Sequence, residues 1–378
     1  MSHLSSIVRG GVFVSAAALI TPAVTAARAQ QFIPDIIISS TMPANGDVNP
    51  YGVAFVPEGF PSGGPLAPGD ILVSNFNSNA SSNAQGTGTT IIKLTPNGLV
   101  SAPGTATPFF QGTPPLGLTT ALGVLKRGFV LVGNLPTSGG VIVPPGSLLL
   151  LDRNGNPVSP SPFTTNKLNG PWDLTIDDGG DQALVFVSNV NDGTSTGTIT
   201  RLNLVISSNQ VTVQSATIIA SGYTVELNSA ALVLGPTGLA HDKGTDILYV
   251  ASTADNMIFA VPNASTRTGP PTPAPTGRVI FKDDHLRGPL ALVFAPNGHL
   301  LTSNGDAVNM DSSQPSEIVE FTKAGKFVSQ FNVDAGQGGA FGIGIAPVSP
   351  GLGTFRLVAV DDNADDIIVI DQNLVPGD

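Results

Sequence analysis

Short apolar runs, each bounded by glycine, proline or a polar residue, follow one another along the chain after residue 30. Within them a phrase recurs: a proline or small residue, a variable residue, a glycine or another small residue, and then an apolar strand. The six copies begin at Pro50, Ala121, Pro171, Pro236, Pro289 and Ala340. Their spacings of 71, 50, 65, 53 and 51 residues are close to the ~40 to 50 residues of propeller repeats that carry loop insertions.

Each copy is followed by two further strands. The second strands end in a polar residue and are predicted at 71–75, 130–134, 185–189, 248–252, 300–304 and 357–361. The third strands are predicted at 90–94, 147–151, 198–202, 257–261, 317–321 and 366–370. Each unit is therefore predicted to be a four-stranded antiparallel meander. A small sheet that is apolar on both faces can bury them only between two neighbouring sheets, so the units are expected to form a ring.

The last unit lacks a fourth strand, because only eight polar-rich residues follow Ile370. The segment from Phe32 to Ser40 precedes the first copy and belongs to no unit, so we expect it to be the outermost strand of the last blade. The predicted fold is all-β, a six-bladed β-propeller of four-stranded antiparallel blades that is closed by this N-terminal strand. A β-helix or two stacked sandwiches are the alternatives, but their repeats are shorter or lack this order of strands.

Composition supports a large globular β domain. Hydrophobic residues make up 41% and charged residues 11% of the 378 residues, which excludes a disordered chain. The 44 glycines and 32 prolines are spread along the chain as turn signals. The formal charge of −11 disfavours nucleic acid and anionic lipid as partners. The absence of cysteine excludes disulfides and thiolate metal sites.

The N-terminus has the features of a secretory signal. Arg9 precedes an apolar run from Gly11 to Ile20, and Ala27-Arg28-Ala29 matches a signal-peptidase site. The alternative, a buried helix, would be interrupted by Pro22. We therefore predict a signal peptide over residues 1–29, a single β-propeller domain over residues 30–378, and a periplasmic or extracellular location. No later stretch approaches the ~20 apolar residues of a membrane span.

Polar residues gather where first strands begin and second strands end, and a meander brings both positions to one face of the ring. Oxygen atoms near the axis are predicted there to bind a polar ligand or to hold Ca²⁺ or another divalent cation. The polar loops 76–88 and 305–315 lie on the same face and are candidates for recognition. The predicted ligand-binding residues are Asn49, Asn75, Asn134, Asn169, Asp173, Asn189, Asn304 and Asp361.

Each of these residues also has a structural interpretation. Asn and Asp at strand ends commonly close Asx-turns on their own backbone. Asp173 stands where other first strands have glycine or alanine, and it is either a satisfied structural carboxylate or part of a ligand site. The sequence Asp361-x-Asn363-x-Asp365 imitates the start of a calcium loop, yet Asp366 replaces the required glycine and Gln372 the closing glutamate. An EF-hand is thereby excluded, which leaves a solvated acidic turn or a looser cation site.

The unit around Leu248–Ile258 and the acidic turn at 361–366 resemble NHL-type propeller repeats. The order of the whole chain, and the opening Asn49–Phe55, resembles a family of uncharacterised exported bacterial proteins within the NHL-like and SMP-30-like six-bladed propellers. That superfamily includes gluconolactonases, which carry a metal-binding glutamate where this chain has Asn49-Pro50, and streptogramin lyases, which use several histidines on a metal. The mature chain has only His241, His285 and His299. The resemblance therefore implies the fold and carries over neither activity.

Two function classes stay open. The first is a secreted binding or interaction propeller, monomeric, whose polar loop face and central channel contact a small molecule or an envelope or extracellular protein. The second is a metal-dependent, lactonase-like hydrolase or lyase with a cation at the axis. A purely structural surface protein is a third possibility. No G-x-S-x-G elbow, phosphate loop or H-E-x-x-H motif occurs, so no catalytic residue is named.

Overall fold

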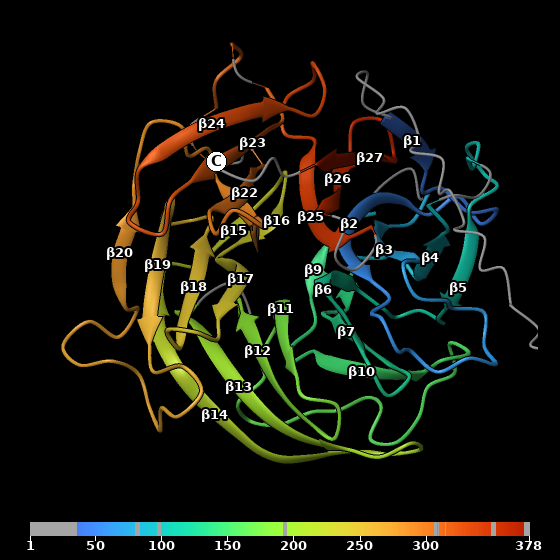
Figure 1. Cartoon of the computed structure of the whole chain (residues 1–378), viewed down its shortest axis with the longest axis horizontal. Coiled ribbons are helices and arrows are strands. Elements are labelled where there is room, and N and C mark those ends of the chain that lie inside the picture. Colours follow the sequence, from blue (N-terminus) through green and yellow to red (C-terminus); the bar gives the residue numbers. More distant parts are fainter. Residues whose placement is uncertain are drawn as a thin grey trace, which may run out of the picture. The chain divides into compact units, whose positions relative to one another are not determined.

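Six small antiparallel sheets stand around a common axis and form a β-propeller (Figure 1). The computed structural model of the chain describes residues 36–79, 84–96, 100–191, 195–305, 308, 310–313, 315–348 and 353–373. All regular elements in these ranges are strands, so no helix of the described chain could cross a bilayer. The predicted signal peptide, residues 1–29, lies outside the described residues.

Each blade is a meander that runs outward from the axis, as the repeat predicts. The innermost strands are β2 (Val48–Phe55), β6 (Leu118–Leu125), β11 (Pro171–Asp178), β17 (Pro236–Asp242), β21 (Pro289–Phe294) and β25 (Ala340–Pro347). The second strands are β3 (Ile71–Asn77), β7 (Phe129–Asn134), β12 (Gln182–Asn189), β18 (Ile247–Ser252), β22 (Leu300–Asn304) and β26 (Thr354–Asp361). The third strands are β4 (Thr90–Leu94), β10 (Ser147–Asp152), β13 (Gly197–Ile206), β19 (Met257–Pro262), β23 (Glu317–Phe321) and β27 (Asp366–Asn373).

The outermost positions vary most between blades. Four blades end in β5 (Thr107–Gln111), β14 (Val211–Tyr223), β20 (Arg278–Phe281) and β24 (Phe327–Asn332). In the second blade, the ladder has three strands, and the outer edge of β10 is met by isolated bridges from Pro157 to Leu151 and from Phe163 to Leu148. These two isolated bridges therefore take the place of the continuous fourth strand that the other blades have.

The N-terminal strand closes the ring, as predicted. β1 (Ile36–Ser40) pairs antiparallel with β27, from Ile36 opposite Ile370 to Ser40 opposite Asp366. Residues 32–35 of the predicted strand lie outside the described residues. Because β1 supplies the outer strand of the sixth blade, the first and last segments of the chain share one sheet.

Apolar side chains are buried mainly between neighbouring blades. Six core clusters occupy the six interfaces; the one between the second and third blades, for example, contains Leu131, Leu150, Val185 and Leu202. A seventh cluster lies at the axis. This distribution follows from sheets that are apolar on both faces, since each face is removed from water only by the adjacent blade.

The recurring small residue in the first strand is explained by the crowding of the strands at the axis. A Cβ on Gly52 would lie 2.4 Å from the Thr120 carbonyl oxygen, and one on Gly342 would lie 2.3 Å from that of Tyr51.

The second copy of the repeat is shifted from its predicted register. Leu118, not Ala121, stands opposite the strand-end Asn134, as Pro50 stands opposite Asn75. The bulge in β6 spans one more residue than that in β2, which the sequence phrase does not reveal.

Gly238 offers a direct test of this crowding. A Cβ at that position would lie 2.4 Å from both the Leu290 carbonyl oxygen and the Leu292 amide nitrogen. We expect Gly238→Ala to lower the free energy of unfolding by about 1–3 kcal/mol, because backbone of the next blade must shift. The measurement is urea unfolding against Gly269→Ala, whose Cβ would meet nothing within 4 Å. Equal stability of the two variants would contradict the crowding.

Candidate functional site

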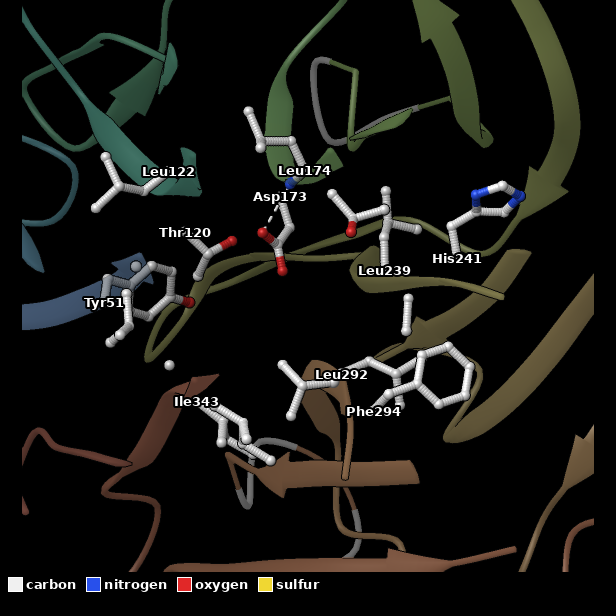
Figure 2. Close-up of a pocket in the computed structure, with 17 residues that line it drawn as sticks. Tyr51, Thr120, Leu122, Asp173, Leu174, Leu239, His241, Leu292, Phe294 and Ile343 are labelled. Carbon is white, nitrogen blue, oxygen red and sulfur yellow. Dashed lines mark hydrogen bonds between the residues drawn. The ribbon is translucent and has the colours of Figure 1, made fainter. Parts of the chain in front are cut away.

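All six innermost strands contribute to a cavity of about 250 Å³ on the propeller axis. We call it the axial cavity. Most of the side chains that line it are apolar, among them those of Leu122, Leu174, Leu239, Leu292 and Ile343, but polar atoms form most of its open wall; Tyr51 stands at one end. Figure 2 shows the Asp173 carboxyl and the Tyr51 and Thr120 hydroxyls pointing toward the same space. The cavity is thus a small space framed by apolar side chains, into which several polar groups are directed.

Asp173 is the one carboxylate among the described residues that line this cavity. Its Oδ1 accepts a hydrogen bond of 2.7 Å from the Leu174 amide, and its own amide donates to Ser188 Oγ at 3.0 Å. Burial raises the pKa of Asp173 to about 7, against the lowering effect of the Leu174 hydrogen bond. At neutral pH the group is therefore divided between its charged and neutral forms.

Three hydroxyls, those of Tyr51, Thr120 and Thr175, and a histidine are the other polar side chains of the wall. Burial and the charges of Asp362 and Asp173 raise the pKa of Tyr51, so its hydroxyl keeps its proton. The Thr120 hydroxyl donates to the Trp172 carbonyl oxygen. His241 lines the cavity, but its ring points away from it (Figure 2), and Nε2 lies 3.1 Å from Asp246 Oδ1. The ring bonds to a turn of its own blade and packs on Phe186 of the third blade with a centroid distance of 4.8 Å, so the histidine is part of the packing between blades.

An aromatic layer separates the axial cavity from the face where the first strands begin. It consists of Tyr51, Phe76, Trp172 and Phe341. Tyr51 stacks on Phe76 with a centroid distance of 4.9 Å, and Trp172 meets both rings edge-on. A hairpin formed by β15 (Glu226–Asn228) and β16 (Leu232–Leu234) packs its Leu232 and Val233 against this layer. We refer to this end of the axis as the loop face.

A second cavity, of about 330 Å³, lies between the aromatic layer and this hairpin. We call it the loop-side cavity. Tyr51, Phe76 and Phe341 line it from the layer, and Ala231 and Val233 line it from the hairpin. Tyr51 lines both cavities. The channel that the sequence predicts is therefore divided into two chambers by an aromatic partition.

Four of the predicted ligand-binding asparagines are buried inside the blades. Asn75, Asn189 and Asn304 are 0% exposed and Asn134 is 6% exposed. The side-chain oxygens of Asn134, Asn189 and Asn304 accept from the amides of Gly117, Asn169 and Arg287, just before the innermost strands. The side-chain amides of all four donate toward the third strand, for example Asn75 to Thr90 Oγ1 at 3.1 Å. In these contacts each asparagine ties strands of its own blade together at the loop face.

Asn189 provides a test of this structural role. Its removal would leave the Asn169 amide and the Thr200 hydroxyl without this partner inside the protein. We expect Asn189→Ala to lower the free energy of unfolding by about 2–3 kcal/mol, the cost of stranding buried polar groups. Chemical denaturation would be compared with Asn209→Ala in the exposed turn between β13 and β14. A loss of the same size in both variants would contradict the role.

Two of the other three predicted residues of the loop face, Asn49 and Asp361, lie around the acidic turn of the sixth blade, whereas Asn169 lies in the third blade beside Asn189. Asn49 adopts a positive φ of 58° and its amide donates to Asp365 Oδ1 at 2.8 Å. Asp361 accepts from the Asn363 amide at 3.1 Å, while the Asn169 side-chain oxygen is buried without a partner. Asn49 lines the loop-side cavity, and Asp173 is the only one of the eight predicted residues at the axial cavity.

Crowded carboxyls dominate the acidic turn. Burial, with the neighbouring charges of Asp365 and Asp361, raises the pKa of Asp362 to about 8. Burial and nearby carboxylates likewise raise the pKa of Asp366 to about 6. In the described part of the chain, no three His, Asp or Glu side chains converge in a way that could hold a metal ion. Cation binding by the predicted amide and carboxylate oxygens stays a prediction.

The aromatic partition is the feature that sequence reasoning missed. Tyr51, Trp172 and Phe341 occupy the same position of the repeat phrase, directly after the proline or alanine that begins it. That shared position was a usable signal, because equivalent positions of a ring of blades meet at the same height on the axis. No such pattern in the sequence predicts the position of the β15–β16 hairpin, because the aromatic residues that it packs against are distant in sequence. Of the predicted recognition loops, residues 80–83, 306–307, 309 and 314 lie outside the described residues.

Comparison with known proteins gives a fold and no closer relative. No protein-family model and no curated protein sequence matches the chain. Among solved structures, a gluconolactonase from Xanthomonas campestris is 11% identical, with 89% of each chain covered and a TM-score of 0.51. An α-L-arabinofuranosidase from Fusarium graminearum is also 11% identical, with 89% of this chain and 97% of that chain covered and a TM-score of 0.50.

A calcium-binding protein, regucalcin, from Agrobacterium tumefaciens is 14% identical, with 87% of this chain and 93% of that chain covered and a TM-score of 0.46. At such identities the likeness concerns the fold, because sites diverge far faster than architecture. The predicted fold is confirmed at that level: the chain is a β-propeller of six blades, and its likeness to the gluconolactonase structure is one of fold.

Proposed function

We propose that this protein is a binding propeller whose axial cavity takes a compact, largely apolar ligand that carries one ammonium group. The observation that supports this proposal is the position of Asp173, the one carboxylate among the described residues that line this chamber on the axis. Ionisation of this carboxyl is costly when the cavity is empty. It becomes favourable once a cation is paired with the carboxylate.

The rest of the cavity suits the body of such a ligand. Leucine and isoleucine side chains from several blades surround the space next to the carboxyl (Figure 2). Burial of the ligand's apolar carbons against these side chains would contribute to affinity, and the charge of Asp173 would fix the ligand's orientation. The Tyr51 hydroxyl, held protonated and directed into the same space, can hydrogen-bond the ligand without adding charge.

The test is a titration by calorimetry with cyclohexylammonium, and with cyclohexanol as its neutral counterpart. We expect the ammonium to bind, and Asp173→Asn to weaken it at least tenfold. Affinity should increase from pH 5 to pH 8, because the carboxylate forms as the pH passes about 7. Asp284→Asn, which changes an exposed carboxylate, serves as the matched control and should bind as the unmodified protein does.

Three results would overturn the proposal: no binding of the ammonium, equal binding of cyclohexanol, or unchanged affinity in Asp173→Asn. Hydrolysis of a simple lactone that is lost in Asp173→Asn would instead favour the hydrolase alternative. The same protein preparations serve both assays, so the two functions are distinguished directly.

We also propose that the protein acts outside the cytoplasm, on a small molecule of its surroundings or with an envelope partner. The charged start, apolar run and Ala27-Arg28-Ala29 site support export. Expression of the full chain in a bacterium that secretes proteins should yield a mature N-terminus at Gln30. Recovery of the intact chain from the cytoplasm would contradict this prediction.

A further inference from the structure

We propose that a groove between the fifth and sixth blades is a binding site for a neutral aliphatic chain that ends in a hydroxyl group. The groove has a volume of about 290 Å³. We call it the interblade groove. Of the described residues that line the groove and the axial cavity, only Ile345 belongs to both. The site therefore does not depend on Asp173 or on the function proposed for the axial cavity.

The groove arises because the blades diverge as they run outward from the axis, so the gap between neighbouring sheets widens. Between the first and second blades, Val56, Phe60 and Leu66 of the β2–β3 connection fill that gap. In the fifth blade the equivalent connection, from β21 to β22, is a turn of only five residues, 295–299. The described residues leave a space there, between the sheets whose outer strands are β24 and β1 (Figure 1).

Apolar side chains from both sheets form the inner wall of the groove. Leu301 and Ile318 come from the fifth blade, and Leu357 and Ile370 come from the sixth. Apolar atoms make up most of the open wall. Phe331 lines the groove from the outermost strand of its blade and is 45% exposed. An aliphatic ligand would therefore remove this side chain from water together with its own carbons, which is the main source of hydrophobic affinity.

The apolar surface continues past the groove onto β1. Ile36 stands opposite Ile370 and Ile38 stands opposite Ile368, so these side chains share one face of the sixth sheet. Ile36 is 56% exposed and Ile38 is 53% exposed. A continuous exposed apolar surface marks a binding site, whereas single scattered apolar residues do not. Because the groove and this strip together are elongated, they match an extended chain better than a compact ring.

The charge pattern of the groove favours a neutral head group. Glu320 is the only ionisable side chain among the described residues that line it. Its Oε1 accepts a hydrogen bond of 2.9 Å from Asn297 Nδ2 and lies 2.6 Å from His299 Nδ1. An anionic head group would meet this carboxylate without a lysine or arginine to pair with. A cationic head group would compete with the two partners that the carboxylate already has.

The polar rim can bind a hydroxyl group. Ser329 and Gln372 line the groove and are exposed, and neither side chain hydrogen-bonds another residue of the described chain. Together they offer donors and acceptors, which is what a hydroxyl group requires. At about 290 Å³ the groove is near the lower limit of the ~300–1,000 Å³ of small-molecule sites, so it suits a single short chain.

The test is a titration with 1-octanol at pH 7, followed by saturation-transfer NMR, with octanoate as its anionic counterpart. We expect 1-octanol to bind saturably and octanoate to bind at least tenfold more weakly. Affinity should fall about fourfold for each methylene that is removed, through 1-heptanol to 1-hexanol, because burial of one methylene contributes about 0.8 kcal/mol.

Ser329→Trp is the decisive variant, because the introduced indole ring would occupy the groove from an exposed position. We expect it to weaken binding of 1-octanol at least tenfold. Phe331→Ser removes the aromatic part of the wall and should weaken binding at least threefold, which provides a second test if Ser329→Trp does not fold. Val328→Ser is the matched control. Val328 is 42% exposed on the same strand but lies outside the groove, so this variant should bind as the unmodified protein does.

Failure of 1-octanol to bind saturably would overturn the proposal, as would equal binding of octanoate. Binding by both Ser329→Trp and Phe331→Ser that equals binding by Val328→Ser would also overturn it. Asp173→Asn separates the groove from the axial cavity, and binding of 1-octanol should survive this substitution. Loss of binding in that variant would place 1-octanol in the axial cavity and remove the groove as a site.

Discussion

Replacing Asp173 with asparagine is expected to stabilise the protein by about 2–4 kcal/mol at pH 8 and to change its stability little at pH 4. The pKa of Asp173 is about 7 in the folded protein and 3.8 as a free side chain. Between these values the folded chain binds a proton that the unfolded chain has released, so the free energy of unfolding falls as pH rises. Asparagine cannot ionise, yet its Oδ1 can still accept from the Leu174 amide.

The measurement is urea unfolding of both proteins at pH 4 and pH 8, with Asp284→Asn as the exposed control. Asp362 and Asp366 act in the same direction, because their pKa values are also raised, to about 8 and about 6. The unmodified protein should therefore be most stable near pH 4 and lose stability up to about pH 8. An equal effect of Asp173→Asn at both pH values would show that its charge is not the cause.

Removal of the closing strand is expected to have the largest effect on folding. A chain that begins at Thr41 lacks β1, and β27 would lose its outer partner along five residues. The ring would then open at the sixth blade and expose an apolar sheet edge. We expect no cooperative thermal transition for this chain, or an aggregate by size-exclusion chromatography. A synthetic peptide of residues 32–44, added during refolding, should restore the cooperative transition and prevent aggregation.

Two point variants test how much the packing of β1, as distinct from its strand pairing, contributes to stability. Ile37 packs in the core between the sixth and first blades, whereas Ile38 is 53% exposed on the opposite face. Ile37→Lys should lower the free energy of unfolding by about 2–4 kcal/mol, and Ile38→Lys should change it by less than about 0.5 kcal/mol. Similar melting temperatures for the two variants would mean that β1 contributes little to closure.

The two cavities and the buried carboxyls share one cause. Six strands that converge at an axis exclude water from its centre, so any ionisable group there is shifted toward its neutral form. Asp173 and Asp362 lie on opposite sides of the aromatic layer, and both raise the pKa of Tyr51. The partition therefore separates two chambers, one lined by Asp173 and the other by Asp362.

Local patterns in the sequence were enough to predict the architecture. The number of blades, the order of strands and the pairing of β1 with β27 all follow from where apolar runs begin and end. Burial at period two along a strand is a property of that strand alone, and a two-faced apolar sheet has few ways to leave water. The polar ends of the second strands were predicted for the same reason.

The tertiary structure alone decided what those polar ends do. Asn75, Asn134, Asn189 and Asn304 were predicted to face a ligand, and they bond to strands of their own blades inside the protein. Whether a strand-end side chain turns inward depends on amides brought beside it from an earlier segment. The same holds for the cavities. Their walls are set by the convergence of six strands, by one extra bulge residue in β6 and by a hairpin from between two blades. No single strand contains that information, because it arises only where distant segments meet.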